Sequence, residues 1–163
     1  MTKRARFLSY AALIAALYTA LTYLQDFLIP GSSSWAIQFR ASEALCVLAF
    51  FTPAAIPGLA VGCLLFNLTF AASLPLDFLV GTLATVLATG SMRLLRKVPA
   101  IGLLMPALWN ALLVGWELSA YIGGGFWINA LYVAIGEAAV LLTLGTVLYF
   151  ALRSRNLHIR LFE

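Results

Sequence analysis

One uncharged run constrains the fold of this chain more than any other feature. No charged residue lies between Glu43 and Asp77. An α-helix needs only about 20 apolar residues to cross the hydrocarbon core of a bilayer. The run exceeds one crossing, and the prolines of "TPAAIP" interrupt it because proline removes a helical hydrogen-bond donor. It predicts two membrane-embedded helices joined by a tight turn.

The rest of the chain is equally apolar. Hydrophobic residues make up 63% of the sequence and charged residues 10%, and the mean hydropathy is +1.00. A secreted protein has one short apolar segment followed by a soluble body, whereas here the apolar character continues to about residue 152. We therefore expect an all-α integral membrane protein, a single membrane domain over residues 1–163. Its six predicted transmembrane helices cover approximately 7–29, 41–51, 57–72, 76–92, 101–121 and 126–152.

The basic residues indicate how these helices are oriented. The net charge of +4 is compatible with nucleic-acid binding, but nine of the ten basic residues form three clusters that flank apolar segments. Cytoplasmic ends of membrane helices carry such clusters. We therefore expect both termini in the cytoplasm, a lipid environment and no nucleic-acid partner. The clusters are Lys3, Arg4 and Arg6; Arg93, Arg96 and Lys97; and Arg153, Arg155 and Arg160.

Polar side chains gather towards the opposite, outer ends of the predicted helices. Ionisable groups in a bilayer are costly, so each is a functional candidate. The inner half offers no comparable set, which predicts an outward-opening pocket for a small solute. The candidates are Arg40, Glu43, Asn67, Asp77, Asn110, Glu117, Asn129 and Glu137, accompanied by Trp35, Trp116 and Trp127.

Most of these candidates have a structural alternative. Arg40 and Glu43, three residues apart on one helix face, can pair with each other. Asp77 can cap a helix, Asn67 and Asn110 can join neighbouring helices, and the tryptophans suit a membrane interface; only Trp109 is too deep for that interface. Glu137 differs because it is a mid-helix carboxylate with no basic residue in its predicted helix. For Glu137 we favour contact with a ligand.

The first predicted helix carries a stripe of small residues. Ala12, Ala16 and Ala20 recur every four residues, which allows close approach of another helix of this chain or of a separate protein. Cys46 and Cys63 lie in apolar helical segments without paired spacing, so we expect buried thiols and no metal site or other cofactor.

Three segments together resemble the QueT family of substrate-binding (S) components of energy-coupling factor (ECF) transporters. They are "FRASEALCVLAFFTPAAIPGLAVGCLLFNL", "NALLVGWEL" and "FWINALYVAIGEAAV", and the similarity runs from about residue 7 to 150. The resemblance implies a six-helix S component in a prokaryotic plasma membrane. It implies partnership with a transmembrane coupling protein and two ATPase subunits, and a coupling-protein contact at Ala12, Ala16 and Ala20.

The implied ligands are 7-deazaguanine bases, the queuosine precursors. The carboxylate of Glu137, or secondly Glu117, would accept the ring N–H and the exocyclic amine. Asn110 or Asn129 would donate to the ring oxygen, and a tryptophan would stack on the base. Glu117 or Asp77 would balance a cationic aminomethyl group. The same residues would also suit thiamine or another flat cationic vitamin.

Two other function classes fit the sequence less well. A self-sufficient carrier needs a polar path through the inner half, and none is visible in the sequence. An intramembrane enzyme needs a reactive centre, but the single histidine, His158, lies in the C-terminal tail, and there is no H-E-x-x-H motif. The chain also lacks the G-x-x-x-x-G-K-[ST] phosphate loop, so ATP hydrolysis would fall to partner subunits.

Overall fold

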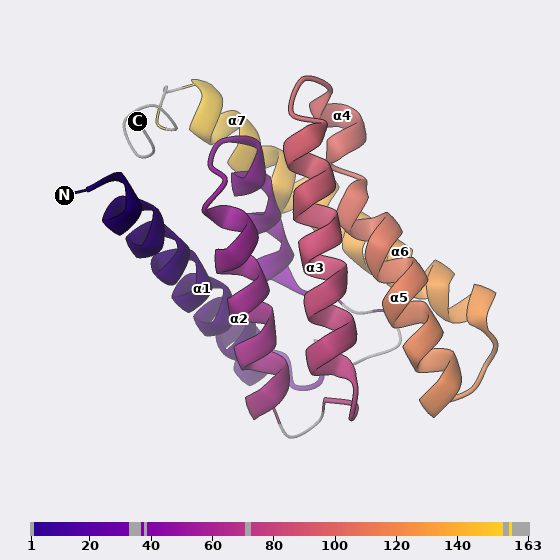
Figure 1. Ribbon diagram of the computed structural model, residues 1–163. Helices are drawn as coiled ribbons and strands as arrows, with labels where there is room; N and C mark the ends of the chain where they lie inside the picture. The colour runs from indigo at the N-terminus through magenta and orange to yellow at the C-terminus, as the bar shows by residue number, and fades with distance from the viewer. Residues whose placement is uncertain (1, 33–36, 38, 71–72, 155–156, 158–163) are drawn as a thin grey trace.

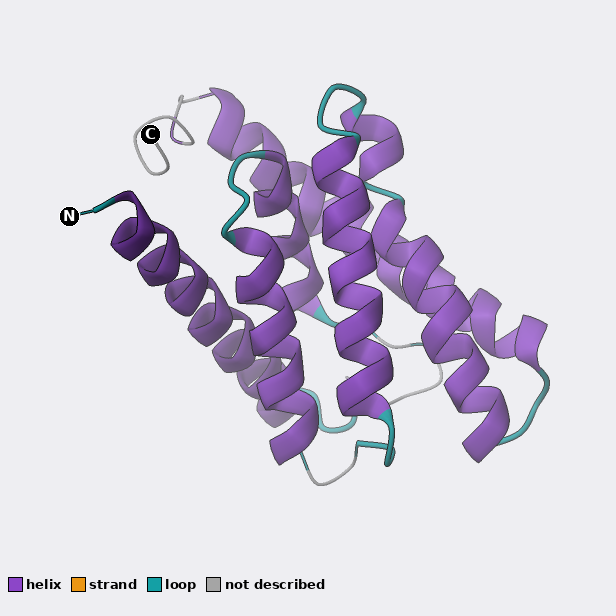
Figure 2. Cartoon of the chain, viewed as in Figure 1, coloured by secondary structure: helices purple, strands orange, loops and turns teal. Residues whose placement is uncertain are grey.

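A computed structural model describes residues 2–32, 37, 39–70, 73–154 and 157, and every regular element in this part of the chain is helical (Figures 1 and 2). Trp35 and His158 lie outside the described residues. The elements are α1 (Lys3–Leu28), η1 (Ala41–Phe50), α2 (Ala55–Thr69), α3 (Asp77–Leu94), α4 (Pro99–Gly102), α5 (Met105–Tyr121), α6 (Phe126–Val140), η2 (Leu141–Gly145) and α7 (Thr146–Ser154).

The helical prediction is confirmed, and three segments are long and apolar enough to cross a membrane. They are Lys3–Leu28, Pro99–Tyr121 and Phe126–Ser154, the last comprising α6, η2 and α7. The other helices are shorter, at 18 residues for α3, 15 for α2 and 10 for η1. The three long apolar segments support a membrane protein. A total of six membrane crossings is a proposal.

The second predicted helix has an unexpected geometry. Residues 41–50 form a 3₁₀-helix, η1, rather than an α-helix. A 3₁₀-helix rises about 2.0 Å per residue against 1.5 Å, so ten residues cover about 20 Å instead of about 15 Å. This tighter winding lets a short segment extend further through the bundle. Runs of this length are uncommon, so tertiary packing rather than local preference holds η1 in this form.

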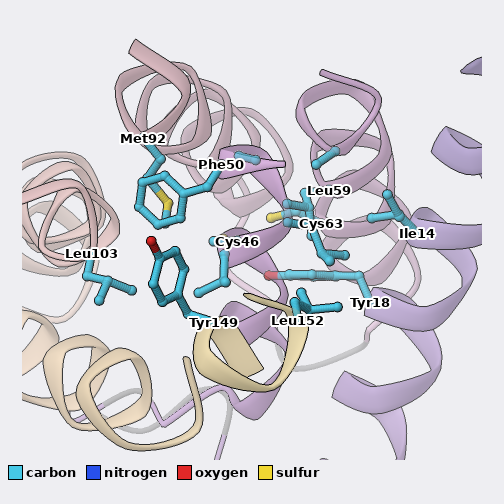
Figure 3. Close-up of a cluster of buried hydrophobic side chains, with 14 residues drawn as sticks. Ile14, Tyr18, Cys46, Phe50, Leu59, Cys63, Met92, Leu103, Tyr149 and Leu152 are labelled. Atoms are coloured by element: carbon cyan, nitrogen blue, oxygen red, sulfur yellow. The ribbon is translucent and has the colours of Figure 1, made fainter. Parts of the chain in front are cut away.

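The central position of η1 supplies that packing. Eight of its ten residues are buried, and it contacts α1, α2, α3, α6, η2 and α7. Figure 3 shows Cys46 and Phe50 of η1 among side chains from several other helices, including Leu59, Met92 and Tyr149. The ring centroids of Phe50 and Tyr149 lie 5.7 Å apart in an edge arrangement. The main apolar core is thus built around η1.

Helices α1 and α2 run in the same direction and touch through glycines. A Cβ atom added at Gly58 would lie 2.7 Å from the carbonyl oxygen of Ala11, and one at Gly62 would lie 2.9 Å from that of Ala15. Ala11 and Ala15 are accordingly buried against α2. The stripe Ala12, Ala16 and Ala20 is exposed on another side of α1, so the described part of this chain does not cover it.

Replacing Gly62 by alanine is expected to lower the free energy of unfolding by about 1–3 kcal/mol, because the new methyl group would overlap backbone of α1. The matched control is Gly90→Ala in α3, where a Cβ meets no atom within 4 Å. The control is expected to be neutral or slightly stabilising, since alanine favours a helix more than glycine does. Unfolding of the two variants in detergent, monitored by circular dichroism, tests this; equal stability changes would contradict the close α1–α2 contact.

The two ends of the bundle differ in charge. The start of α1, the end of α3 and the end of α7 lie at one end of the bundle (Figure 1). Lys3, Arg93 and Arg153 occupy these helix ends. Arg93 Nη1 donates to the carbonyl oxygen of Phe50 at 2.9 Å and so closes the last turn of η1. The opposite end, where η1, α3 and α6 begin, carries the candidate site.

Candidate functional site

Four buried carboxyl groups and one buried guanidinium make up the candidate site. Arg40 precedes η1, and the acids come from four different elements: Glu43 from η1, Asp77 from α3, Glu117 from α5 and Glu137 from α6. None of the five side chains is more than 7% exposed. The guanidinium interacts electrostatically with all four acids. We call these five residues the Arg40 cluster.

Arg40 and Glu43, which the sequence places at the outer end of a predicted helix, are both buried. They are 7% and 2% exposed. The guanidinium carbon of Arg40 lies 5.6 Å from the centroid of the Phe66 ring, a cation–π distance. Arg40 is buried because the chain enters the bundle just before η1 begins at Ala41.

Gln25 of α1 holds that inward path. Its Oε1 accepts a hydrogen bond from the backbone N–H of Ala41 at 2.5 Å, and its Nε2 donates to the carbonyl oxygen of Phe39 and to Ser32 Oγ, the latter at 2.8 Å. One side chain thereby fixes the residues on both sides of Arg40. We did not single out Gln25 from the sequence, because its partners lie far from it along the chain.

Glu43 has donors on both oxygens. The hydroxyl of Tyr18 donates to Oε1, and Cys46 Sγ donates to Oε2 at 3.2 Å. Tyr18 is fully buried, and one turn further along α1 the hydroxyl of Thr22 lies 2.7 Å from Ser42 Oγ. This contribution of α1 was not predicted from the sequence. The spacing of Tyr18 and Thr22, four residues apart on one helix face, is the feature that could have indicated it.

Buried acceptor atoms without a hydrogen-bond donor are confined to three of the candidates. Over the described residues, the buried side-chain nitrogen and oxygen atoms lacking any partner are Asn67 Oδ1, Glu117 Oε1, Glu117 Oε2 and Glu137 Oε2. Leaving one such group unpaired costs about 1–3 kcal/mol, and more when it is charged. All four are oxygen atoms that can act as hydrogen-bond acceptors. The ligand-free site therefore has a deficit of N–H or O–H donors.

Asp77 and Asn67 also have structural partners. Asp77 Oδ2 accepts from the backbone N–H of Leu74 at 2.7 Å, which ties the turn before α3 to the first residue of that helix. Asn67 Nδ2 donates to the carbonyl oxygen of Asp77 at 3.0 Å and so joins α2 to α3. The Asp77 carboxyl neighbours that of Glu117. Two adjacent carboxylates repel unless a proton or a cationic group lies between them.

The two remaining polar candidates, Asn129 and Asn110, have different surroundings. Asn129 Nδ2 donates to the carbonyl oxygen of Gly123 at 2.7 Å and holds the turn of three glycines with positive φ angles. Asn110 is buried on α5, seven residues before Glu117 and therefore on the same helix face. Asn110 can line the site, whereas Asn129 serves the turn.

The structure does not bring the tryptophans of α5 and α6 into the cluster. Trp116 is 52% exposed and Trp127 80% exposed, as suits residues at a membrane interface. Trp109 Nε1 donates to Ser91 Oγ at 3.1 Å and links α5 to α3. An aromatic ring that does lie beside the cluster is Phe66, which packs against the rings of Tyr23 at 5.0 Å and Phe70 at 4.8 Å.

Two further features bear on the chemistry available. Among the described residues, no group of three or more histidine, cysteine or acidic side chains is placed to hold a metal ion. Three surface cavities of about 300, 380 and 450 Å³ all lie at the basic end of the bundle. The Arg40 cluster lines none of these three.

Comparison with known proteins gives one match. The family model described as "QueT transporter" matches residues 8–154. No curated protein and no solved structure matches the chain.

Proposed function

The chain belongs to the QueT transporter family, and on that premise we propose that it is the substrate-binding component of an energy-coupling factor importer for a queuosine precursor. Membership of a transporter family makes the protein a transporter rather than an enzyme. The apolar helices support a location in a membrane. We further propose that the chain crosses a prokaryotic plasma membrane six times, with both termini in the cytoplasm. Its ligand would be a 7-deazaguanine base.

One observation carries the ligand assignment: the four unpaired acceptor atoms of Asn67, Glu117 and Glu137. A ligand that fits them brings several N–H donors close together. The guanine-like edge of a 7-deazaguanine presents a ring N–H beside an exocyclic amine, and one carboxylate can accept from both. We assign that edge to Glu137 and give Glu117 the next contact.

The charge balance of the Arg40 cluster supports the same ligand class. Four buried carboxyls interact electrostatically with one guanidinium, so a cationic group on the ligand would reduce the repulsion among them. An aminomethyl substituent would supply such a group beside Glu117 and Asp77. A cyano substituent would leave the edge contacts to Glu137 unchanged and would lack this attraction.

Other candidate residues have secondary roles in the proposal. Asn110 would donate to the ring oxygen, because Asn129 already bonds its own turn. Stacking would fall to Trp35, in the segment before η1, because Trp116 and Trp127 are exposed. Glu43 would position Arg40 rather than contact the ligand, since Tyr18 and Cys46 occupy its two oxygens.

The partners follow from the exposed face of α1 and from the sequence. Ala12, Ala16 and Ala20 are exposed, which makes them available to a transmembrane coupling protein. The sequence has no phosphate loop, so two ATPase subunits would supply the energy.

Calorimetry on the purified protein tests the ligand class. We expect cyano- and aminomethyl-7-deazaguanine to bind, and guanine, thiamine and riboflavin to bind much more weakly or not at all. Absence of binding by every deazaguanine, or preference for thiamine, would refute the assignment. Uptake assays in cells with and without a coupling module test the transport role: uptake without the module would show a stand-alone carrier.

A further inference from the structure

A second site, chemically distinct from the Arg40 cluster, lies at the basic end of the bundle. A cavity of about 300 Å³ separates the start of α1 from the turn between η1 and α2. Its lining combines two cations with two hydroxyl groups and no acid: Lys3, Arg6, Phe7, Tyr10, Thr52, Pro53 and Ala54. Such a lining suits an anion.

The groups around the cavity are arranged to hold a phosphate. The guanidinium carbon of Arg6 lies 5.9 Å from the centroid of the Tyr10 ring, which orients the arginine by a cation–π contact. Opposite it, Thr52 Oγ1 accepts from the backbone N–H of Ala54 at 3.3 Å, and its O–H remains able to donate. Arginine and lysine bind phosphate oxygens through charge-assisted hydrogen bonds.

An apolar track continues from the cavity along the same face of α1. Arg6, Tyr10, Leu13 and Leu17 follow one another at spacings of four, three and four residues, which places them on one side of a helix. The track goes on through further exposed leucines at the same spacing: Leu21, Leu24 and Leu28. A phosphate site that opens onto a track of leucines matches a molecule with an anionic head and a long apolar chain.

We propose that this cavity binds the headgroup of an anionic phospholipid, whose acyl chain lies along the leucine track of α1. Basic pockets at the cytoplasmic ends of membrane helices bind such headgroups. The acyl track borders the alanine stripe, because Ala16 and Ala20 follow Leu13 and Leu17 by three residues each. Lipid binding does not depend on the identity of the transported solute.

The test compares the thermal stability of the full chain, purified in a neutral detergent, during titration with phosphatidylglycerol, phosphatidylcholine of the same chain length, or inorganic phosphate. Phosphatidylglycerol is expected to raise the melting temperature at concentrations at which the other two have little effect. An equal rise with phosphatidylcholine would exclude headgroup recognition. A full rise with inorganic phosphate would reduce the site to one for a free anion and would overturn the proposal.

Variants separate this cavity from general surface charge. The double variant Lys3→Gln/Arg6→Gln is expected to move the phosphatidylglycerol titration midpoint at least tenfold higher. The matched control Arg96→Gln/Lys97→Gln removes two charges from the same end of the bundle, outside this cavity, and is expected to leave the midpoint within about twofold. Equal shifts in both variants would contradict a specific site. A normal midpoint combined with lost uptake in Lys3→Gln/Arg6→Gln would assign the cavity to a protein partner instead.

Discussion

Replacing Ala16 by tryptophan is expected to abolish uptake by the assembled importer while leaving ligand affinity within about twofold. Ala16 lies at the centre of the exposed stripe on α1, and its side chain does not contribute to the α1–α2 contact made by Ala11 and Ala15. Close helix approach between membrane proteins depends on small residues, so an indole at this position would hold a partner helix away. The ligand site would be unaffected, because Ala16 faces away from the bundle.

The matched control for this variant is Ala139→Trp. Ala139 is an exposed alanine of α6, so the control adds the same bulk to a different outer face. It should retain both uptake and binding. Transport of a labelled deazaguanine in cells, with calorimetry on the purified proteins, measures the two properties separately. Retained uptake in Ala16→Trp would remove the stripe from the partner interface, and loss of uptake in both variants would show a general intolerance of bulk.

Replacing Glu117 or Glu137 by glutamine is expected to weaken deazaguanine binding at least tenfold in each case. Tenfold corresponds to about 1.4 kcal/mol. Glutamine keeps the shape of the side chain but exchanges one acceptor oxygen for an NH₂ group, which would face the N–H donors of the ligand. Calorimetry measures the loss. Asp26→Asn is the control, since the Asp26 carboxyl accepts from the backbone N–H of Gly31 at 3.2 Å and is not part of the Arg40 cluster.

The stability of the same variants separates ligand contact from a structural role. Both oxygens of Glu117 and one of Glu137 are buried without a donor in the ligand-free protein. Removing the charge should therefore leave the unliganded protein equally stable or more stable. A structural carboxylate would behave in the opposite way. Thermal unfolding that shows marked destabilisation, together with unchanged affinity, would contradict the assignment of these acids to the ligand.

The positions of the helices were largely predictable from the sequence. Apolar runs, proline pairs and glycine turns set the predicted segments, and the segment at 41–51 agrees within one residue with η1. The 3₁₀ form of this segment was not predictable, because the local sequences of 3₁₀- and α-helices differ little. The packing of η1 against the surrounding helices determines which form it takes. The segment at 126–152 was predicted as one helix and contains a π-helical turn, Leu141–Gly145, after Glu137.

The direction in which side chains face was harder to predict. The first helix carries small residues on two faces, and only the glycines of α2 determine that Ala11 and Ala15 pack inside while Ala12 and Ala16 are exposed. Similarly, Glu117 and Trp116 are adjacent in sequence, yet Glu117 is fully buried and Trp116 is half exposed. The rotation of a helix about its own axis determines which of two adjacent residues is buried. Contacts with residues distant in sequence set that rotation.

The burial of Arg40 depended on a contact of this long-range kind. A lone arginine before an apolar helix is typically placed at the water interface, where charge is tolerated. The hydrogen bonds of Gln25 with Phe39 and Ala41 hold this segment in place, and four acids from separate elements interact electrostatically with the guanidinium. The sequence supplied the members of the site, and the tertiary fold determined that Arg40 lies at its centre.

A structure of the protein determined with bound aminomethyl-7-deazaguanine would show which side chains hold the base. We expect the guanine-like edge within hydrogen-bond distance, about 2.7–3.2 Å, of the Glu137 carboxylate, with Glu117 or Asp77 beside the aminomethyl group. A base bound elsewhere, with the carboxylates of Glu117 and Glu137 still unpaired, would contradict this expectation.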